Sequence, residues 1–151
     1  MNRTAGTRSG ALVLVVLMGL LTMAFAAAAQ AATEGGGKQK VVVQVSDNSP
    51  GKWNLALNNA ANVQNALGGP GKVDIEVVVY GPGIGMLTLD SEVGSRVENI
   101  LGKGVKVVAC QNTMRAKGLK KEDMLPHIGY VPAGVIEIMK KQQQGYAYIR
   151  P

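Results

Sequence analysis

The chain has 151 residues, of which 16 are Lys or Arg and 10 are Asp or Glu, so its net charge near neutral pH is +6. The basic residues are dispersed and only 4% of the residues are aromatic, which argues against nucleic-acid binding, because that function uses basic patches and stacking aromatic side chains. The single cysteine excludes a disulfide within the chain.

The N-terminal segment has the pattern of a secretory signal peptide. A basic start with Arg3 and Arg8 is followed by an apolar run over residues 11–29 and by Ala29-Gln30-Ala31, a small-x-small cleavage site. A retained membrane anchor is the alternative, since the apolar run is long enough to span a bilayer. We expect cleavage, and therefore a periplasmic or secreted protein that does not stay in the membrane. The predicted organisation is a signal peptide over 1–31, a linker over 32–39 and one domain over 40–151.

The first predicted strand covers residues 40–45, whose β-branched valine run is typical of a sheet that is covered on both faces. Ser46-Asp47-Asn48-Ser49-Pro50 then supplies a helix N-cap and a proline for the first turn. Apolar residues from Trp53 to Leu67 recur at helical spacing, with Trp53 as the expected core anchor of the helix. The second predicted strand covers residues 73–80.

Gly81-Pro82-Gly83-Ile84-Gly85 is predicted to be a tight loop that leads into a short apolar segment, and Ser91 is predicted to cap the next helix. The glycine spacing is superficially similar to a dinucleotide-binding fingerprint. The last glycine position holds Met86 and no long helix follows at once, so we do not expect a nucleotide site. The third predicted strand covers residues 105–109.

The later elements are shorter. The Lys120-Lys121 and Lys140-Lys141 pairs are expected on solvated helix faces. Strands that alternate with helices predict an α/β fold with a parallel sheet and helices on both faces. The expected order is a short helix capped by Asn112 or Thr113, another at 119–124, a strand at 128–131, a helix that opens at Pro132, and a strand at 146–149.

Ligand sites in such sheets lie beyond the carboxyl ends of the strands. The segments 46–48, 81–85 and 110–113 each follow a predicted strand, so we expect them to meet at that edge. Asp47 is expected there as a turn or cap residue. His127 has no partner residues with metal-ligand spacing, so no metal site is predicted. It is expected to be structural, or to give a proton to Cys110 if the fold brings the two together.

Cys110 is predicted to lie where the third strand meets the N-terminus of a helix. The helix dipole and free backbone N–H groups at that position would favour thiolate over thiol. Arg115 and Lys117 would add positive potential. If the sulfur is partly accessible, its thiolate can attack sulfane sulfur, form a persulfide or mixed disulfide, or be oxidised. The alternative is that Cys110 is a small buried apolar residue.

Several segments together carry a family resemblance that covers about Lys40 to Pro151. They are Val45-Ser46-Asp47, Trp53-Asn54-Leu55-Ala56-Leu57-Asn58-Asn59-Ala60, Tyr80-Gly81-Pro82-Gly83, Val108-Ala109-Cys110-Gln111-Asn112-Thr113-Met114, Val131-Pro132-Ala133-Gly134-Val135 and Gly145-Tyr146-Ala147-Tyr148-Ile149-Arg150-Pro151. In this order they resemble the DsrE/DsrF-like family, also called YchN-like. The resemblance implies a three-layer α/β/α domain with a mostly parallel five-stranded sheet. It also implies assembly into trimers or hexamers and, in some relatives, sulfur carried on a cysteine.

Cys110 stands at the matching loop, so the resemblance implies that it carries the sulfur. We expect an exported sulfur carrier or sulfurtransferase-like protein that accepts sulfane sulfur as a persulfide, with no metal or cofactor and with a sulfur donor or acceptor protein as partner. Backbone N–H groups of Asn112 and Thr113 are expected to support the thiolate or persulfide, and the loop with Gly81 and Gly83 to form the opposite lip. Two alternatives stay open: a non-catalytic oligomeric small-ligand-binding protein with a structural Cys110, and a thiol redox sensor that dimerises through Cys110.

Overall fold

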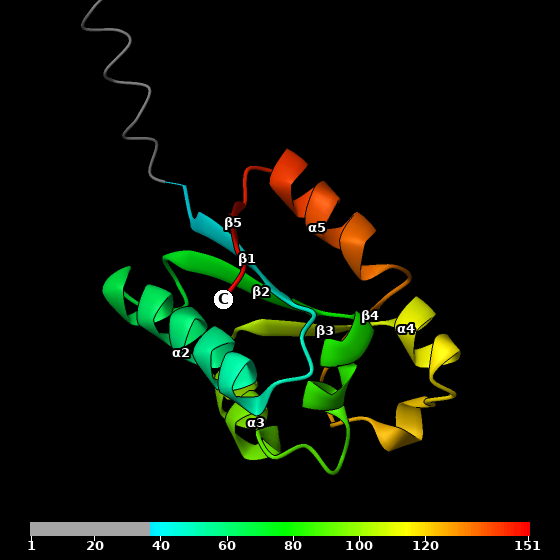
Figure 1. Ribbon diagram of the computed structural model, residues 1–151. Helices are drawn as coiled ribbons and strands as arrows, with labels where there is room; N and C mark the ends of the chain where they lie inside the picture. The colour runs from blue at the N-terminus through cyan, green and yellow to red at the C-terminus, as the bar shows by residue number, and fades with distance from the viewer. Residues whose placement is uncertain (1–36) are drawn as a thin grey trace, which may run out of the picture. The chain divides into compact units, whose positions relative to one another are not determined.

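The structure is a computed structural model that describes residues 37–151. The predicted signal peptide and most of the predicted linker lie outside the described residues. Figure 1 shows the elements. In chain order they are β1 (Gln39–Val45), α2 (Pro50–Ala66), β2 (Val73–Val79), the 3-10 helix η1 (Gly81–Leu87), α3 (Gly94–Gly102), β3 (Lys106–Cys110), α4 (Gln111–Ala116), the 3-10 helix η2 (Lys121–Asp123), β4 (Gly129–Val131), α5 (Gly134–Gln143) and β5 (Ala147–Ile149).

The strands form one parallel sheet of five strands in the order β4-β3-β2-β1-β5. This confirms the predicted α/β fold with a five-stranded sheet. The unbroken valine run of β1 follows from that architecture, because Val42 and Val43 point to opposite faces and both are fully buried.

Helices cover both faces of the sheet and make three layers (Figure 1). On one face, α2 and α3 pack against the strands through side chains that include Trp53, Leu57 and Val97. On the other face, α5 packs through Ile138 onto a smaller cluster. Sheet residues of this second cluster are Val42, Val78, Val108 and Val131.

The start of α2 agrees with the prediction. Ser49 is the N-cap, its hydroxyl accepts a 3.5 Å hydrogen bond from the N–H of Lys52, and Pro50 opens the helix. Trp53 is buried, and its indole N–H donates to the backbone oxygen of Asp47 at 2.7 Å. The Asp47 carboxylate lies 3.1 Å from the Lys52 ammonium, so Asp47 is a residue of this turn, as expected.

Other helix boundaries differ from the prediction. α3 begins at Gly94, after an N-cap at Val93, and the Ser91 hydroxyl only accepts a 3.4 Å bond from the N–H of Val93. The segment predicted as a glycine-rich loop forms η1. The prediction that Asn112 or Thr113 caps α4 is wrong: Cys110 is itself the N-cap, because β3 runs into α4 without a connecting residue.

The interpretation of Lys140-Lys141 as solvated is wrong for one of the two residues. The Lys141 side chain is 12% exposed and its ammonium lies 2.7 Å from a carboxylate oxygen of Glu76. Glu76 belongs to β2 and faces the sheet side that α5 covers, so burial of α5 draws Lys141 inward. Within residues 37–151, no helix is long and apolar enough to cross a membrane.

Candidate functional site

The segments that follow β1, β2 and β3 meet at the carboxyl edge of the sheet, as predicted. The N–H of Gly83 donates to the backbone oxygen of Ser46 at 3.1 Å. The N–H of Gly81 donates to the Thr113 hydroxyl at 2.9 Å. Only glycine fits at position 83, because a Cβ there would lie 2.8 Å from the backbone oxygen of Val45. η1 is therefore held against both neighbouring segments.

Cys110 lies on the sheet face that α5 covers. Side chains alternate along a strand, so Cys110 shares a face with Val108, which belongs to the cluster beneath α5. Its register partner in β4 is Val131. The turn after Val131 leads directly into α5, so the thiol lies between the first turns of α4 and α5.

Cys110 is more deeply buried than its predicted position at the end of a strand suggested. The residue is 4% exposed, whereas the thiolate chemistry predicted from the sequence assumes a partly accessible sulfur. Position in the chain does not reveal this burial, because it results from the β4–α5 connection lying against the end of β3. The surroundings of the thiol are nevertheless polar. They include the Thr113 hydroxyl and the backbone N–H groups of Gly134, Thr113 and Asn112.

These nearby donors shift the ionisation of the thiol towards the thiolate. Burial by itself raises the pKa of Cys110, but the donors stabilise the thiolate and together hold that pKa below its ordinary value. The Thr113 hydroxyl is the first of the donors, followed by the N–H of Gly134. We expected the charges of Arg115 and Lys117 to contribute, but burial and the nearby donors, with the Thr113 hydroxyl first among them, are the main causes of the shift in this pKa.

Thr113 links η1 to the thiol. A hydroxyl can accept hydrogen bonds while donating its one proton. The Thr113 oxygen accepts from the N–H of Gly81, which leaves its proton for Cys110. Gly81 therefore acts on the sulfur through Thr113.

The other predicted supporting residues differ in how directly they reach the thiol. The N–H of Asn112 is near the sulfur and also donates to the backbone oxygen of Pro132 at 3.2 Å. The Asn112 side chain accepts from Arg115 instead of capping α4. Gly83 bonds to the carbonyls of Ser46 and Tyr80, so it shapes η1 and has no bond to the cysteine.

Sequence reasoning missed Gly134, the donor from α5. Packing is tight at this position: a Cβ there would lie 3.0 Å from both Cβ and Cδ1 of Tyr80, so a larger residue would require the Tyr80 side chain to shift by a few tenths of an ångström. The missing side chain lets the first turn of α5 approach β2 and Cys110. The available signal was the rule that all parallel strands end at one edge, which also places the segment after β4 beside the cysteine.

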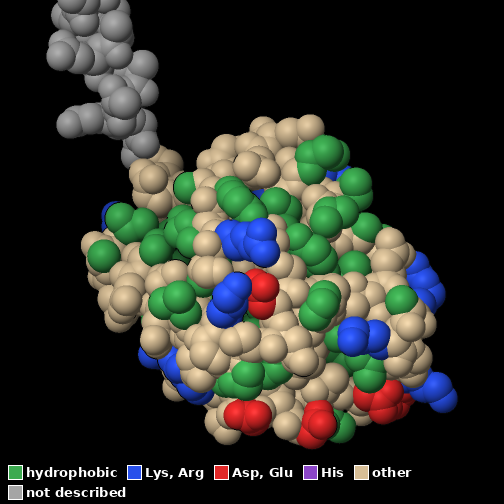
Figure 2. All heavy atoms as spheres, in the orientation of Figure 1, with side chains coloured by type: hydrophobic (Ala, Val, Ile, Leu, Met, Phe, Trp, Pro, Cys, Tyr) green, Lys and Arg blue, Asp and Glu red, His purple; other side chains and the backbone are tan. Residues whose placement is uncertain are grey.

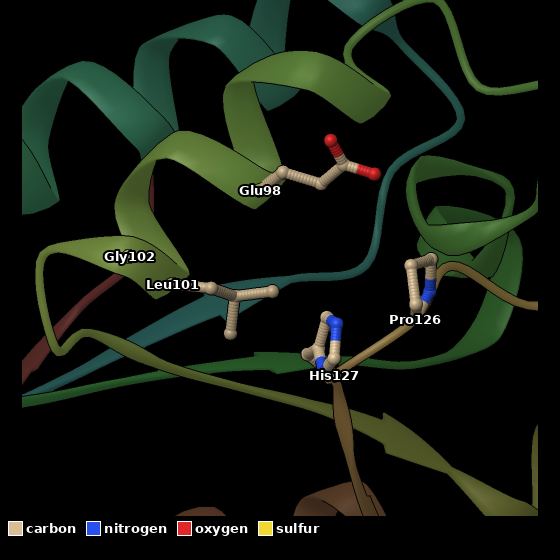
Figure 3. A pocket seen from close by; sticks show the side chains of 5 residues that line it. All are labelled: Glu98, Leu101, Gly102, Pro126 and His127. Atoms are coloured by element: carbon tan, nitrogen blue, oxygen red, sulfur yellow. The ribbon is translucent and has the colours of Figure 1, made fainter.

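His127 lies away from Cys110. It precedes the amino end of β4, whereas Cys110 pairs with Val131 at the carboxyl end, so the two residues are at opposite edges of the sheet. His127 and its neighbours line a hollow of about 460 Å³, in which His127 and Pro126 face Glu98 and Leu101 of α3 (Figure 3). No three His, Cys, Asp or Glu side chains gather as metal ligands in the described part of the chain.

Comparisons with known proteins agree with this architecture. The chain is similar to a protein of unknown function from Methanobacterium thermoautotrophicum, MTH1491, at 36% identity and a TM-score of 0.72, covering 76% of this chain and 100% of that one. It shares its fold with BT1422 from Bacteroides thetaiotaomicron, a protein of unknown function, at 16% identity and a TM-score of 0.61, covering 75% of this chain and 95% of that one.

YchN from E. coli has the same fold, at 9% identity and a TM-score of 0.62, with 76% of this chain and 100% of that one covered. No curated protein shows significant similarity to the chain. The profile of the DsrE/DsrF-like family matches residues 39–151. With this match over most of its length, and with the predicted sheet in place, the chain belongs to the DsrE/DsrF-like family, a membership that points to a role related to sulfur relay.

Proposed function

We propose that the protein is a sulfur carrier that binds sulfane sulfur as a persulfide on Cys110. The observation that carries this proposal is the set of donors around a single cysteine: the Thr113 hydroxyl and three backbone N–H groups favour the thiolate. A thiolate is the form of cysteine that attacks sulfur. Family membership supports the same chemistry.

Sulfur uptake and sulfur transfer are both thiol–disulfide-type exchanges, and each balances without an added oxidant or reductant. After Cys110 gives its proton to solvent, the thiolate attacks the sulfane sulfur of an inorganic polysulfide. One S–S bond forms, one S–S bond of the polysulfide breaks, and the electron pair leaves with the shortened polysulfide. In the second exchange a thiolate of the acceptor attacks the outer sulfur of the persulfide and releases the Cys110 thiolate.

The burial of the thiol favours a small donor. With 4% of the residue exposed, access to the thiol is restricted, so we propose a small linear polysulfide as the donor instead of a bulky group. The outer sulfur of the persulfide, the atom that the acceptor attacks, would lie about 2 Å from the cysteine sulfur. The N–H groups near Cys110 would then stabilise the charge of the persulfide as they stabilise that of the thiolate.

Mass measurement of the intact protein tests this proposal. Residues 38–151 are incubated with inorganic polysulfide, and the mass is expected to rise by one sulfur atom and to return after treatment with a thiol. Cys110→Ser is the matched control and should gain nothing. If the wild-type protein gains no sulfur at a polysulfide concentration that loads a free thiol, the proposal is wrong.

The burial of Cys110 also favours a second candidate, a binding protein in which this cysteine only fills space. Alkylation separates the two functions. A structural cysteine reacts only after denaturation, whereas a carrier thiol reacts in the folded protein at mildly acidic pH. A redox sensor is recognised by a disulfide-linked dimer on non-reducing gels after oxidation.

We further propose that the protein works outside the cytoplasm, because residues 1–31 have the pattern of a signal peptide. The mass of the protein isolated from a bacterial periplasmic fraction tests this. Cleavage after Ala31 is the expected result, and an uncleaved protein in the membrane fraction would contradict it.

A further inference from the structure

A buried ion pair joins the C-terminal half of α5 to the sheet. Glu76 of β2 is 4% exposed, and one of its carboxylate oxygens lies 2.7 Å from the ammonium of Lys141, whose side chain is 12% exposed. The Lys141 ammonium also lies 3.7 Å from Glu137 and 4.9 Å from the centre of the Tyr146 ring. Lys141 is therefore enclosed by two carboxylates and an aromatic ring.

This pair is poorly suited to stabilising the fold. Burial removes both charges from water, and the attraction between them often does no more than offset that cost. Burial raises the pKa of Glu76, as expected for a carboxylate that has lost its hydration. The second oxygen, Oε1, is also buried, and none of the described residues donates a hydrogen bond to it. Apolar residues of similar size would fill this space at lower cost.

The ion pair between Glu76 and Lys141 is instead well placed to fix the position of α5 on the sheet. Among the ten residues of this helix only Gly134 and Ile138 are buried. Lys141 continues the same face of the helix, because residues 134, 138 and 141 have helical spacing. The outer side of α5 is exposed at Val135, Ile136 and Met139, and hydrophobic side chains gather there in Figure 2. Two buried residues, one of them a glycine without a side chain, leave the tilt of the helix weakly determined.

The tilt of α5 matters for Cys110. Val131 is the register partner of Cys110 and α5 begins at Gly134, so the first turn of α5 lies beside the sulfur, where the N–H of Gly134 favours the thiolate. Lys141 lies seven residues further along, about 10 Å at 1.5 Å per residue. A rotation of α5 about its buried contacts would move Gly134 away from the sulfur, although neither Glu76 nor Lys141 touches the cysteine.

We propose that Glu76 and Lys141 are positioning residues, which hold the first turn of α5 against Cys110. This inference rests on the proposed function, because it concerns the thiolate that would carry sulfur. The buried ion pair accordingly maintains the geometry around Cys110, and it does so at some cost in the stability of the fold.

The pH dependence of Cys110 alkylation tests the inference, with the thiolate absorbance as a direct second measure. In Lys141→Met the thiolate fraction at a fixed pH below the midpoint should fall roughly tenfold, the effect of losing about one hydrogen bond to a charged group. Lys140→Met, at an exposed neighbour on the same helix, is the matched control and should leave the profile unchanged.

Lys141→Met leaves a buried charge unpaired and can unfold the protein, so a double variant completes the test. Glu76→Leu with Lys141→Met replaces the pair by apolar side chains and should keep or raise the melting temperature. The thiol profile should still shift towards higher pH. If the double variant is folded and its profile equals that of the wild type, the positioning role is refuted.

The outcomes also separate this inference from the proposed function. A wild-type protein that takes up no sulfur, but whose profile still shifts in the double variant, refutes the carrier function and supports the positioning role. If the wild-type protein takes up sulfur and the wild type and the double variant have the same alkylation profile, the carrier function is supported and the positioning role is refuted. A wild-type profile equal to that of a free thiol refutes the positioning role, since there is then no stabilised thiolate to maintain.

Discussion

Replacing Thr113 by valine tests the electrostatics of the site most directly. Valine has nearly the shape of threonine but cannot donate to Cys110 or accept from Gly81. A hydrogen bond to a charged group contributes about 1.5–3 kcal/mol. Since 1.36 kcal/mol corresponds to a factor of ten, the thiolate fraction at a fixed pH below the midpoint should fall roughly tenfold to a hundredfold. The pKa of Cys110 should rise accordingly.

The same change also affects stability. The N–H of Gly81 loses its acceptor, and an unpaired buried donor costs about 1–3 kcal/mol. Because Gly81 is partly exposed, water can replace part of that bond, and we expect the lower end of this range in the free energy of unfolding. Urea unfolding measures this cost, and it shows whether the variant is folded when its thiol is titrated.

The assay is simple because the chain has one cysteine. Ultraviolet absorbance of the thiolate is followed against pH in the wild type, Thr113→Val and Thr113→Ser. Thr113→Ser keeps the hydroxyl and should titrate close to the wild type. If folded Thr113→Val titrates at the same pH as the wild type, the hydroxyl does not stabilise the thiolate and the reasoning is refuted.

Three further predictions concern stability and assembly. Folding lowers the pKa of Cys110 below its ordinary 9.0, so the contribution of the thiolate to stability is complete above that value and is lost as the pH falls through the folded pKa. Urea unfolding across this range should show that the free energy of unfolding of the wild type increases with pH relative to that of Cys110→Ser. The same pH dependence in both proteins would contradict the lowered pKa. Gly134→Ala should reduce the free energy of unfolding by about 1–3 kcal/mol through the clash with Tyr80, and an unchanged urea midpoint would show that the first turn of α5 can move aside. We also propose that the protein forms a homo-oligomer through the exposed outer side of α5; light scattering should show a mass that falls to the monomer in Met139→Glu, and a wild-type monomer would refute this.

Local sequence determined the order and type of the elements. The valine runs at 41–43 and 77–79 predict buried strands because both faces of a parallel sheet are covered. Ser49-Pro50 predicts the start of α2 because a hydroxyl cap and a fixed proline φ suit the first turn of a helix. Cys110 at the end of an apolar run was likewise visible as a strand–helix junction. Boundaries were less certain where no capping side chain is used, as at α3 and α4.

Tertiary structure decided how the thiol is surrounded. The sequence by itself placed Cys110 next to Asn112 and Thr113, because these residues follow it in the chain. It did not reveal that the cysteine is buried, that the N–H of Gly134 lies near its sulfur, or that Lys141 turns inward to Glu76. Each of these features joins segments far apart in the sequence, and such contacts depend on strand register and on where α5 crosses the sheet. A periodic pattern records which face of an element is apolar, but it does not record which polar groups meet when two faces pack.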